Sequence, residues 1–387
     1  MNNFFVIVLD GVGIGELPDA KNYSDQGSNT LGNMANRLGG LNLPNLERFG
    51  LGNINPILGI KAQNQPLASY GKLTEISPGK DSTTGHWELG GLKVDIEFPF
   101  YPDGFPQELI NRFLNATGLK GILGNYAASG TEIIKDLGAE HVKTGYPIVY
   151  TSADSVFQIA VHEEVIPINK LYEICTIARE KVLVVKDAVG RIIARPFIGT
   201  EGNYTRTTNR KDFSLDPPSP TILDYCLNEG IETYAIGKVN DLFNYKGIKH
   251  KLKTKSNQEG IDKIIDTAKN VKESFIFTNL VDFDVYYGHR NDPEGLHNAL
   301  KEFDTRLPEI VNCIDETDRL ILTADHGNDP TDISTDHTRE YVPLLYYRKN
   351  IQGKNLGTRK TFSDVAQTVA HYFKINNDLK GTSFLNE

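Results

Sequence analysis

The run Phe4-Phe5-Val6-Ile7-Val8-Leu9 is apolar throughout and ends at Asp10. Its length and its aromatic and β-branched residues predict a strand buried on both faces. Such strands are typical of parallel sheets covered by helices on both sides. The run has no basic flank and is too short for a signal peptide or a membrane span. The first ten residues therefore predict an α/β protein with a carboxylate at the end of its first strand.

Working outward, similar apolar runs alternate with helical periods toward the C-terminal end. Predicted strands lie at residues 233–236, 274–281 and 319–323, and predicted helices lie at 222–228, 259–271, 294–313 and 363–373. Alternating strands and helices predict a mostly parallel sheet flanked by helices.

A middle section, residues 99–217, has Pro-rich and turn-rich borders, as domain crossings often do. It contains predicted strands at 148–151, 157–161 and 191–194 and a predicted helix at 170–181. We expect it to be an inserted smaller α/β cap or substrate domain, so that the catalytic core is discontinuous and comprises residues 1–98 and 218–387.

The amino-acid composition limits the classes of function that the chain can have. The chain has 387 residues, 39% of them hydrophobic and 24% charged, which fits about two globular domains. Its net charge of -9 argues against a nucleic-acid partner, because phosphate backbones need a basic face. The three scattered cysteines form no zinc motif and no disulfide framework, which fits a reducing cytosol, so we expect a cytoplasmic protein. No stretch approaches eighteen apolar residues, so we expect no membrane partner. The sequence leaves the oligomeric state undecided.

Carboxylates follow three predicted core strands. Asp10, Asp284 and Asp325 each come at or just after a strand end. One such aspartate is as often a turn former or a helix cap. Three of them would converge, because sites in open α/β sheets form beyond the carboxyl ends of the strands.

Histidines accompany these aspartates. His289 follows Asp284, His326 is adjacent to Asp325, and His337 lies in Asp336-His337-Thr338. Three aspartates and three histidines make two three-ligand sets, which suit Mn²⁺ or Zn²⁺ better than Ca²⁺. Two such ions about 4 Å apart would clamp a phosphoryl group in transfer. For five of the other histidines we expect only structural or surface roles: His141, His162, His250, His297 and His371.

The segment from Gly79 to Glu88 holds three consecutive hydroxyls, Ser82, Thr83 and Thr84. It is not a P-loop, because its Gly-Lys comes before the hydroxyls without the required glycine spacing. A loop of this kind is commonly a helix cap. Beside two metal ions, one of its hydroxyls could be a nucleophile.

Seven strings in order resemble the phosphopentomutase family of the alkaline phosphatase superfamily, over essentially the whole chain. They are residues 10–15 with 18–20, and residues 79–88, 150–156, 190–196, 279–284, 324–330 and 335–340. The resemblance implies an alkaline phosphatase-like core with an inserted cap. It also implies two Mn²⁺ ions, or other divalent ions, with one ion held by Asp10, Asp325 and His326 and the other by Asp284, His289 and His337.

The resemblance further implies an isomerase that interconverts the 1-phosphates and 5-phosphates of ribose or deoxyribose through a phosphoenzyme, with a sugar bisphosphate as activator. The family usually carries threonine where this chain has Ser82, which keeps the hydroxyl. Ser82 is thus the expected acceptor, and Thr83 or Thr84 would replace it if the register were displaced. The implied substrate residues are Ser152, Asp154, Arg191, Arg206 and Lys238.

Three alternatives remain at this point. A metal-dependent phosphatase or phosphodiesterase of the superfamily would share the same ligands. Another mutase of the superfamily is the second alternative, either one that acts on a different phosphosugar or a cofactor-independent phosphoglycerate mutase, which would have a longer chain. A non-catalytic metal-binding scaffold would have no need of the hydroxyl loop.

Overall fold

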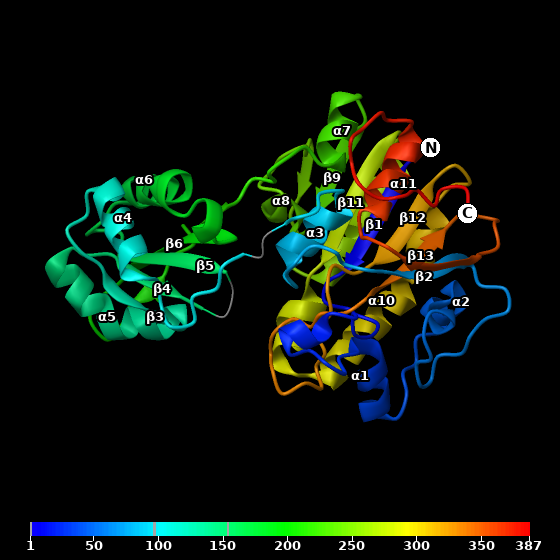
Figure 1. Ribbon diagram of the computed structural model, residues 1–387, viewed down its shortest axis with the longest axis horizontal. Helices are drawn as coiled ribbons and strands as arrows, with labels where there is room; N and C mark the ends of the chain where they lie inside the picture. The colour runs from blue at the N-terminus through cyan, green and yellow to red at the C-terminus, as the bar shows by residue number, and fades with distance from the viewer. Residues whose placement is uncertain (1, 96–97, 153–154) are drawn as a thin grey trace. The chain divides into compact units, whose positions relative to one another are not determined.

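A computed structural model describes residues 2–95, 98–152 and 155–387 of the chain. The chain divides into two compact units (Figure 1). The first, here called the core unit, comprises Met1–Asp95 and Pro217–Glu387, and the second, the inserted unit, comprises Ile96–Asp216.

The core unit is built on one eight-stranded sheet in the order β10-β9-β11-β1-β12-β13-β2-β14. The strands are β1 (Phe4–Leu9), β2 (Ala68–Leu73), β9 (Glu232–Ile236), β10 (His250–Leu252), β11 (Ser274–Leu280), β12 (Arg319–Thr323), β13 (Val342–Tyr347) and β14 (Asn355–Arg359). The strands from β10 to β12 are parallel, as predicted, whereas β13 runs antiparallel to both its neighbours.

Strand β1 lies at the centre of this sheet, and its side chains from Phe4 to Val8 are completely buried. It pairs in parallel with β11 on one side and β12 on the other, with Leu9 opposite Leu280 and Val8 opposite Thr323. All three strands therefore end at the same edge of the sheet, which brings together the residues that follow them.

The helices of the core unit form two groups (Figure 1). In one group, α10 (Pro293–Cys313) contacts α1 (Thr30–Leu38), α2 (Pro44–Phe49) and α9 (Asn257–Asn270). In the other, α3 (Ser82–Leu89) contacts α8 (Val239–Leu242) and α11 (Asp364–Phe373), and α11 also contacts α7 (Ile222–Asn228). The apolar face of α10, the helix predicted at 294–313, is buried and comprises Leu296, Leu300, Phe303, Leu307 and Ile310.

The inserted unit has a six-stranded sheet of its own in the order β3-β4-β5-β6-β7, with β8 also paired to β6. Its strands are β3 (Leu123–Ala127), β4 (Ile148–Thr151), β5 (Val156–His162), β6 (Arg191–Ile198), β7 (Thr205–Arg206) and β8 (Lys211–Ser214), and its α-helices are α4 (Gln107–Thr117), α5 (Gly130–Thr144) and α6 (Ile168–Ile177). Two apolar clusters use alternate residues of β5: Phe157 and Ile159 belong to one, and Ala160 belongs to the other. Both faces of this sheet are therefore covered.

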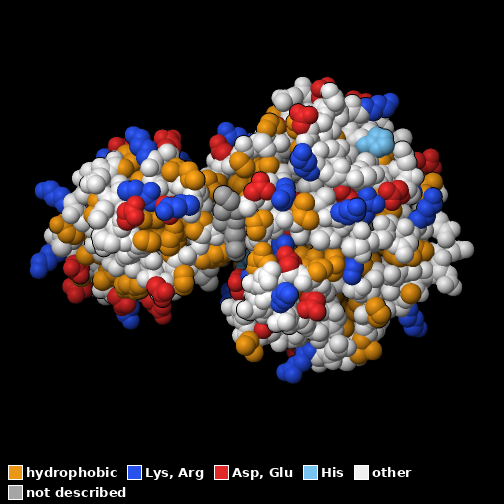
Figure 2. Space-filling view, viewed as in Figure 1, with side chains coloured by type: hydrophobic (Ala, Val, Ile, Leu, Met, Phe, Trp, Pro, Cys, Tyr) orange, Lys and Arg blue, Asp and Glu red, His pale blue; other side chains and the backbone are white. Residues whose placement is uncertain are grey.

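Short helical turns complete the two units. They are Ala20–Tyr23, Leu51–Asn53, Ala178–Val182, Val185–Asp187, Phe283–Tyr287 and Gly288–Arg290. On the face seen in Figure 2, basic and acidic side chains are interspersed instead of gathering into one basic surface. Among the described residues, no helix is both long and apolar enough to cross a bilayer.

Candidate active site and metal centre

The three strand-end aspartates meet at one edge of the core sheet. Asp10 directly follows β1, Asp284 lies in the turn after β11, and Asp325 follows β12 by two residues. Each side chain is buried, with at most 2% of it exposed. The parallel pairing of the three strands is what gathers these carboxylates, because it places their carboxyl ends side by side.

The first ligand group comprises Asp10, Asp325 and His326, whose nearest donor atoms all lie within 4.8 Å of one another. His326 Nε2 lies 3.2 Å from Asp10 Oδ1 and 3.4 Å from Asp325 Oδ2. His326 Nδ1 donates to the carbonyl oxygen of Gly327 at 3.0 Å. The hydrogen bond at Nδ1 leaves Nε2 as the coordinating nitrogen of this ring.

The second ligand group centres on Asp284. His289 Nε2 lies 3.2 Å from Asp284 Oδ2, and His337 Nε2 lies 3.5 Å from Asp284 Oδ1 and 3.1 Å from His289 Nε2. His289 Nδ1 donates to the Thr335 carbonyl oxygen at 2.7 Å, so that its Nε2 also faces the group.

The two groups adjoin each other. Asp284, His326 and His337 also lie within 4.8 Å by their donor atoms, and the rings of His326 and His337 stack with centroids 3.8 Å apart. His326, which the family resemblance places in the first group alone, is thus within reach of both. All six predicted ligands lie together in the core unit.

The electrostatics of this cluster fit a divalent cation. Although burial opposes it, the attraction of His337 and the hydrogen bond from His289 hold the pKa of Asp284 well below its usual value. Burial likewise lowers the pKa of His289, but Asp284 outweighs it and raises that pKa to about 9. Among the described residues, the buried oxygens Asp10 Oδ1 and Asp325 Oδ2 lie 3.2 Å and 3.4 Å from His326 Nε2, the nitrogen that would face a metal ion. Carboxylate oxygens and imidazole nitrogens in this arrangement are a suitable donor set for a divalent transition metal.

Ser82 is the first residue of α3, and its hydroxyl adjoins the ligand groups. Its Oγ lies 3.2 Å from His326 Nε2 and accepts from Lys238 Nζ at 3.3 Å. Asp81 caps the helix by accepting from the backbone N–H groups of Thr83 and Thr84, and Thr84 Oγ1 donates to Asp81 Oδ2 at 2.6 Å. The Thr84 hydroxyl therefore serves the cap, whereas the Ser82 hydroxyl faces the candidate metal centre.

Two buried residues that were not predicted as site residues, His86 and Asn279, contact the aspartates of the first ligand group. His86 Nδ1 lies 2.8 Å from the carbonyl oxygen of Ser82 and 3.0 Å from Asp325 Oδ2. Because both neighbours are acceptors, this nitrogen carries the proton. His86 Nε2 then accepts from Asn279 Nδ2 at 3.2 Å, and the same amide donates to Asp10 Oδ2 at 2.9 Å. His86 and Asn279 thus join the Ser82 helix to both aspartates of the first group.

The predicted substrate residues divide between the units. Lys238 lies in the core unit beside Ser82. Ser152 and Arg191 line a hollow of about 310 Å³ in the inserted unit, to which two further arginines, Arg195 and Arg210, also contribute.

Of the other two predicted substrate residues, the structure describes only Arg206. Arg206 lies on β7, is exposed and is not among the lining residues of the hollow. Asp154 lies outside the described residues.

Comparisons with known proteins agree with this architecture. The model of the metalloenzyme superfamily matches residues 2–377. A phosphopentomutase of Acetivibrio thermocellus is 57% identical over 386 residues, which covers 100% of this chain and 99% of the relative. A phosphopentomutase of Dictyoglomus turgidum is 57% identical over 388 residues and covers 100% of this chain and 98% of its own.

Among solved structures, a phosphoglycerate mutase of Leishmania mexicana aligns with a TM-score of 0.51 at 12% identity, covering 98% of this chain and 97% of its own. This likeness concerns the fold alone. The predicted fold class, an alkaline phosphatase-like α/β core with a mostly parallel sheet, is confirmed. The family match and the ligand groups together support the use of a divalent metal.

Proposed function

The chain belongs to the phosphopentomutase family within the metalloenzyme superfamily, and from this premise we propose how its residues carry out the isomerisation of pentose phosphates. The substrates are ribose or deoxyribose 1-phosphate and the corresponding 5-phosphate. The observation that carries the proposal is the position of Ser82 Oγ, which lies within 3.3 Å of both His326 Nε2 and Lys238 Nζ.

We assign one Mn²⁺ ion to Asp10, Asp325 and His326 and a second to Asp284, His289 and His337. The first group, whose donor atoms lie within 4.8 Å of one another, and the short distances from His289 and His337 to Asp284 support this assignment. Bound divalent ions supply positive charge that stabilises a transferring phosphoryl group and favours the ionised form of a nearby hydroxyl.

Ser82 is the residue that carries the phosphoryl group. In the active form its Oγ is phosphorylated, and this group moves to the free hydroxyl of a pentose monophosphate. The bond from phosphorus to Ser82 Oγ breaks, a bond to the sugar oxygen forms, and the hydroxyl proton of the sugar passes to Ser82. The product is a sugar bisphosphate, whose other phosphoryl group then returns to Ser82 by the reverse exchange.

Lys238 and the inserted unit hold the substrate in this scheme. Lys238 Nζ, already a donor to Ser82 Oγ, neutralises charge on the phosphoryl group as it moves. Arg191 and Ser152 bind the phosphate that is not reacting, which the cationic lining of their hollow supports. We retain Arg206 and Asp154 as further substrate contacts on the family resemblance alone.

A mutase also requires that water be kept from the phosphoserine. A phosphatase with the same ligands would release inorganic phosphate, whereas this chain should return the group to a sugar. The high identity to phosphopentomutases over the full chain favours the mutase.

The experiment is an isomerisation assay with ribose 5-phosphate, Mn²⁺ and a catalytic amount of sugar bisphosphate. Ribose 1-phosphate should form with little inorganic phosphate, and mass mapping should find one phosphate on Ser82. Ser82→Ala should abolish both signals, while Thr83→Ala, which leaves the Ser82 hydroxyl in place, should keep them. Inorganic phosphate as the main product would identify a phosphatase, and phosphate on Thr83 or Thr84 would show that the nucleophile is assigned wrongly.

A further inference from the structure

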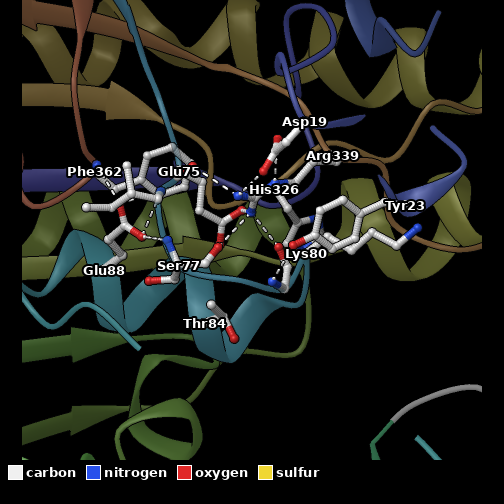
Figure 3. A network of polar contacts seen from close by, with 12 residues as sticks. Asp19, Tyr23, Glu75, Ser77, Lys80, Thr84, Glu88, His326, Arg339 and Phe362 are labelled. Carbon is white, nitrogen blue, oxygen red and sulfur yellow. Dashed lines mark hydrogen bonds and ion pairs between the residues drawn. The ribbon is translucent and has the colours of Figure 1, made fainter. Parts of the chain in front are cut away.

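The guanidinium group of Arg339 lies in a buried polar network beside the candidate active site (Figure 3). We propose that Arg339 is a positioning residue, which fixes the loop before Ser82 relative to the metal ligand His337. This inference rests on the proposed role of Ser82. Arg339 touches none of the six candidate ligands in the described contacts, and only 2% of its side chain is exposed.

Arg339 donates hydrogen bonds to backbone carbonyl groups of the loop from Glu75 to Gly79. Its Nη1 donates to the carbonyl oxygens of Ser77 at 2.9 Å and Gly79 at 2.6 Å, and its Nη2 donates to that of Glu75 at 3.1 Å. Nη1 also donates to the Glu75 carboxylate at 2.7 Å. A planar guanidinium satisfies several fixed acceptors at once, which an ammonium group cannot do with the same geometry.

A buried carboxylate holds the same loop from its N–H side. Glu88, in α3, accepts from the backbone N–H of Ser77 at 2.7 Å and from that of Ile76 at 3.1 Å. It also accepts from Thr361 Oγ1 and from the backbone N–H of Phe362. The loop is therefore fixed between Arg339, which donates to its carbonyl groups, and Glu88, which accepts from its backbone N–H groups (Figure 3). Because these groups are buried, each lost partner would leave a polar atom unsatisfied.

The loop leads directly to the nucleophile. Gly79 is three residues before Ser82, and Arg339 is two residues after His337. Asp25 ties the two segments a second time, because its carboxylate accepts from the backbone N–H of Arg339 at 2.8 Å and pairs with Lys80 Nζ at 3.1 Å. A shift of the guanidinium would thus move the start of α3, and with it Ser82 Oγ, relative to the ligand groups.

The expected effect is on the chemical step and not on binding. Misplacement of a reacting group by about 1 Å costs roughly a hundredfold in rate. Arg339→Lys keeps the charge and loses the planar fork, so its kcat for ribose 5-phosphate should fall about tenfold to a hundredfold. KM should stay within about twofold, because no predicted substrate residue contacts Arg339 in the described structure. The Mn²⁺ content should be unchanged.

The matched control is Arg359→Lys. Arg359 is also a well-paired arginine of the core unit, bonded to Asp364 and Glu387, and in the described structure its side chain forms no hydrogen bond to the loop from Glu75 to Gly79. This variant should melt at a lower temperature and keep its kcat. If Arg339→Lys does not fold, Glu88→Gln tests the same loop from its other side and should also lower kcat with KM retained.

Several outcomes would overturn the inference. A kcat within threefold of the wild type in folded Arg339→Lys would do so, as would an equal loss of kcat in Arg359→Lys or a loss explained by missing Mn²⁺. If Arg339→Lys does not fold, a near-normal kcat in folded Glu88→Gln overturns it as well. Failure of the proposed function looks different, because the wild-type chain itself would then form no ribose 1-phosphate.

Discussion

Replacement of His86 should weaken the first metal site without removing any ligand. The ring supports two ligands at once, because Nδ1 adjoins Asp325 Oδ2 and Nε2 accepts from the Asn279 amide that donates to Asp10 Oδ2. His86→Ala removes the support of Asp325 directly and frees the Asn279 amide from its second partner.

The size of the effect follows from these contacts. Loss of one partner behind a metal ligand typically lowers metal affinity 10- to 100-fold, which corresponds to about 1.4–2.7 kcal/mol. Because His86 supports both aspartates, we expect His86→Ala near the upper end. The amide nitrogen of His86→Asn overlaps the position of Nδ1, so this variant should recover about half of the lost free energy, or roughly tenfold in affinity.

The assay is a Mn²⁺ titration of the metal-free protein, with circular dichroism to confirm folding. His141→Ala is the control, since His141 is a buried, hydrogen-bonded histidine of the inserted unit. It should lower thermal stability and leave the Mn²⁺ affinity of the core unit intact. A dissociation constant for His86→Ala within twofold of the wild type would refute the reasoning, as would an equal change in His141→Ala.

Three other substitutions test the site. Asp325→Asn should lose a metal ion and at least 99% of activity while the chain stays folded, and full metal occupancy by elemental analysis would contradict its role as a ligand. Ser82→Thr should keep activity within about tenfold, because the hydroxyl survives; a loss as complete as that of Ser82→Ala would argue against it as the acceptor. Arg191→Ala should slow isomerisation of ribose 5-phosphate by roughly tenfold to a hundredfold, the value of one charged hydrogen bond, and spare the slow hydrolysis of an aryl phosphate. Equal loss of both activities would assign Arg191 to the chemical site or to the fold.

The ends of the central strands were predictable because their signal is local. The apolar run from Phe4 to Leu9 and the aspartate after it are adjacent in the sequence, and the same holds for Arg319–Thr323 and Asp325. Parallel pairing then gathers the aspartates. The antiparallel strand β13 and its neighbour β2 were not predicted. The segment Ala68–Leu73 contains no β-branched residue and includes Gly71. The apolar segment Val342–Tyr347 contains Pro343, which argues against a strand inside a sheet.

The supporting residues were not predictable for a different reason. Asn279 and His86 are 193 positions apart, and Arg339 and Glu75 are 264 apart. No periodicity or spacing links such pairs, since their contact arises only when distant strands and loops pack together. The same applies to His326, whose reach into both ligand groups depends on how its ring stacks on that of His337.

The central place of β1 has a consequence for synthesis on the ribosome. Both strands that flank it, β11 and β12, are made much later, and about 265 residues separate Leu9 from the start of β11. At usual elongation rates of about 5–20 residues per second, the run from Phe4 to Leu9 waits roughly 15 to 50 s for its first partner. The inserted unit, whose segments are contiguous in sequence, has all its strands available in the meantime. A fully apolar strand therefore emerges first and stays unpaired until most of the chain has been made, which makes the nascent chain a natural client of chaperones that shield unpaired strands.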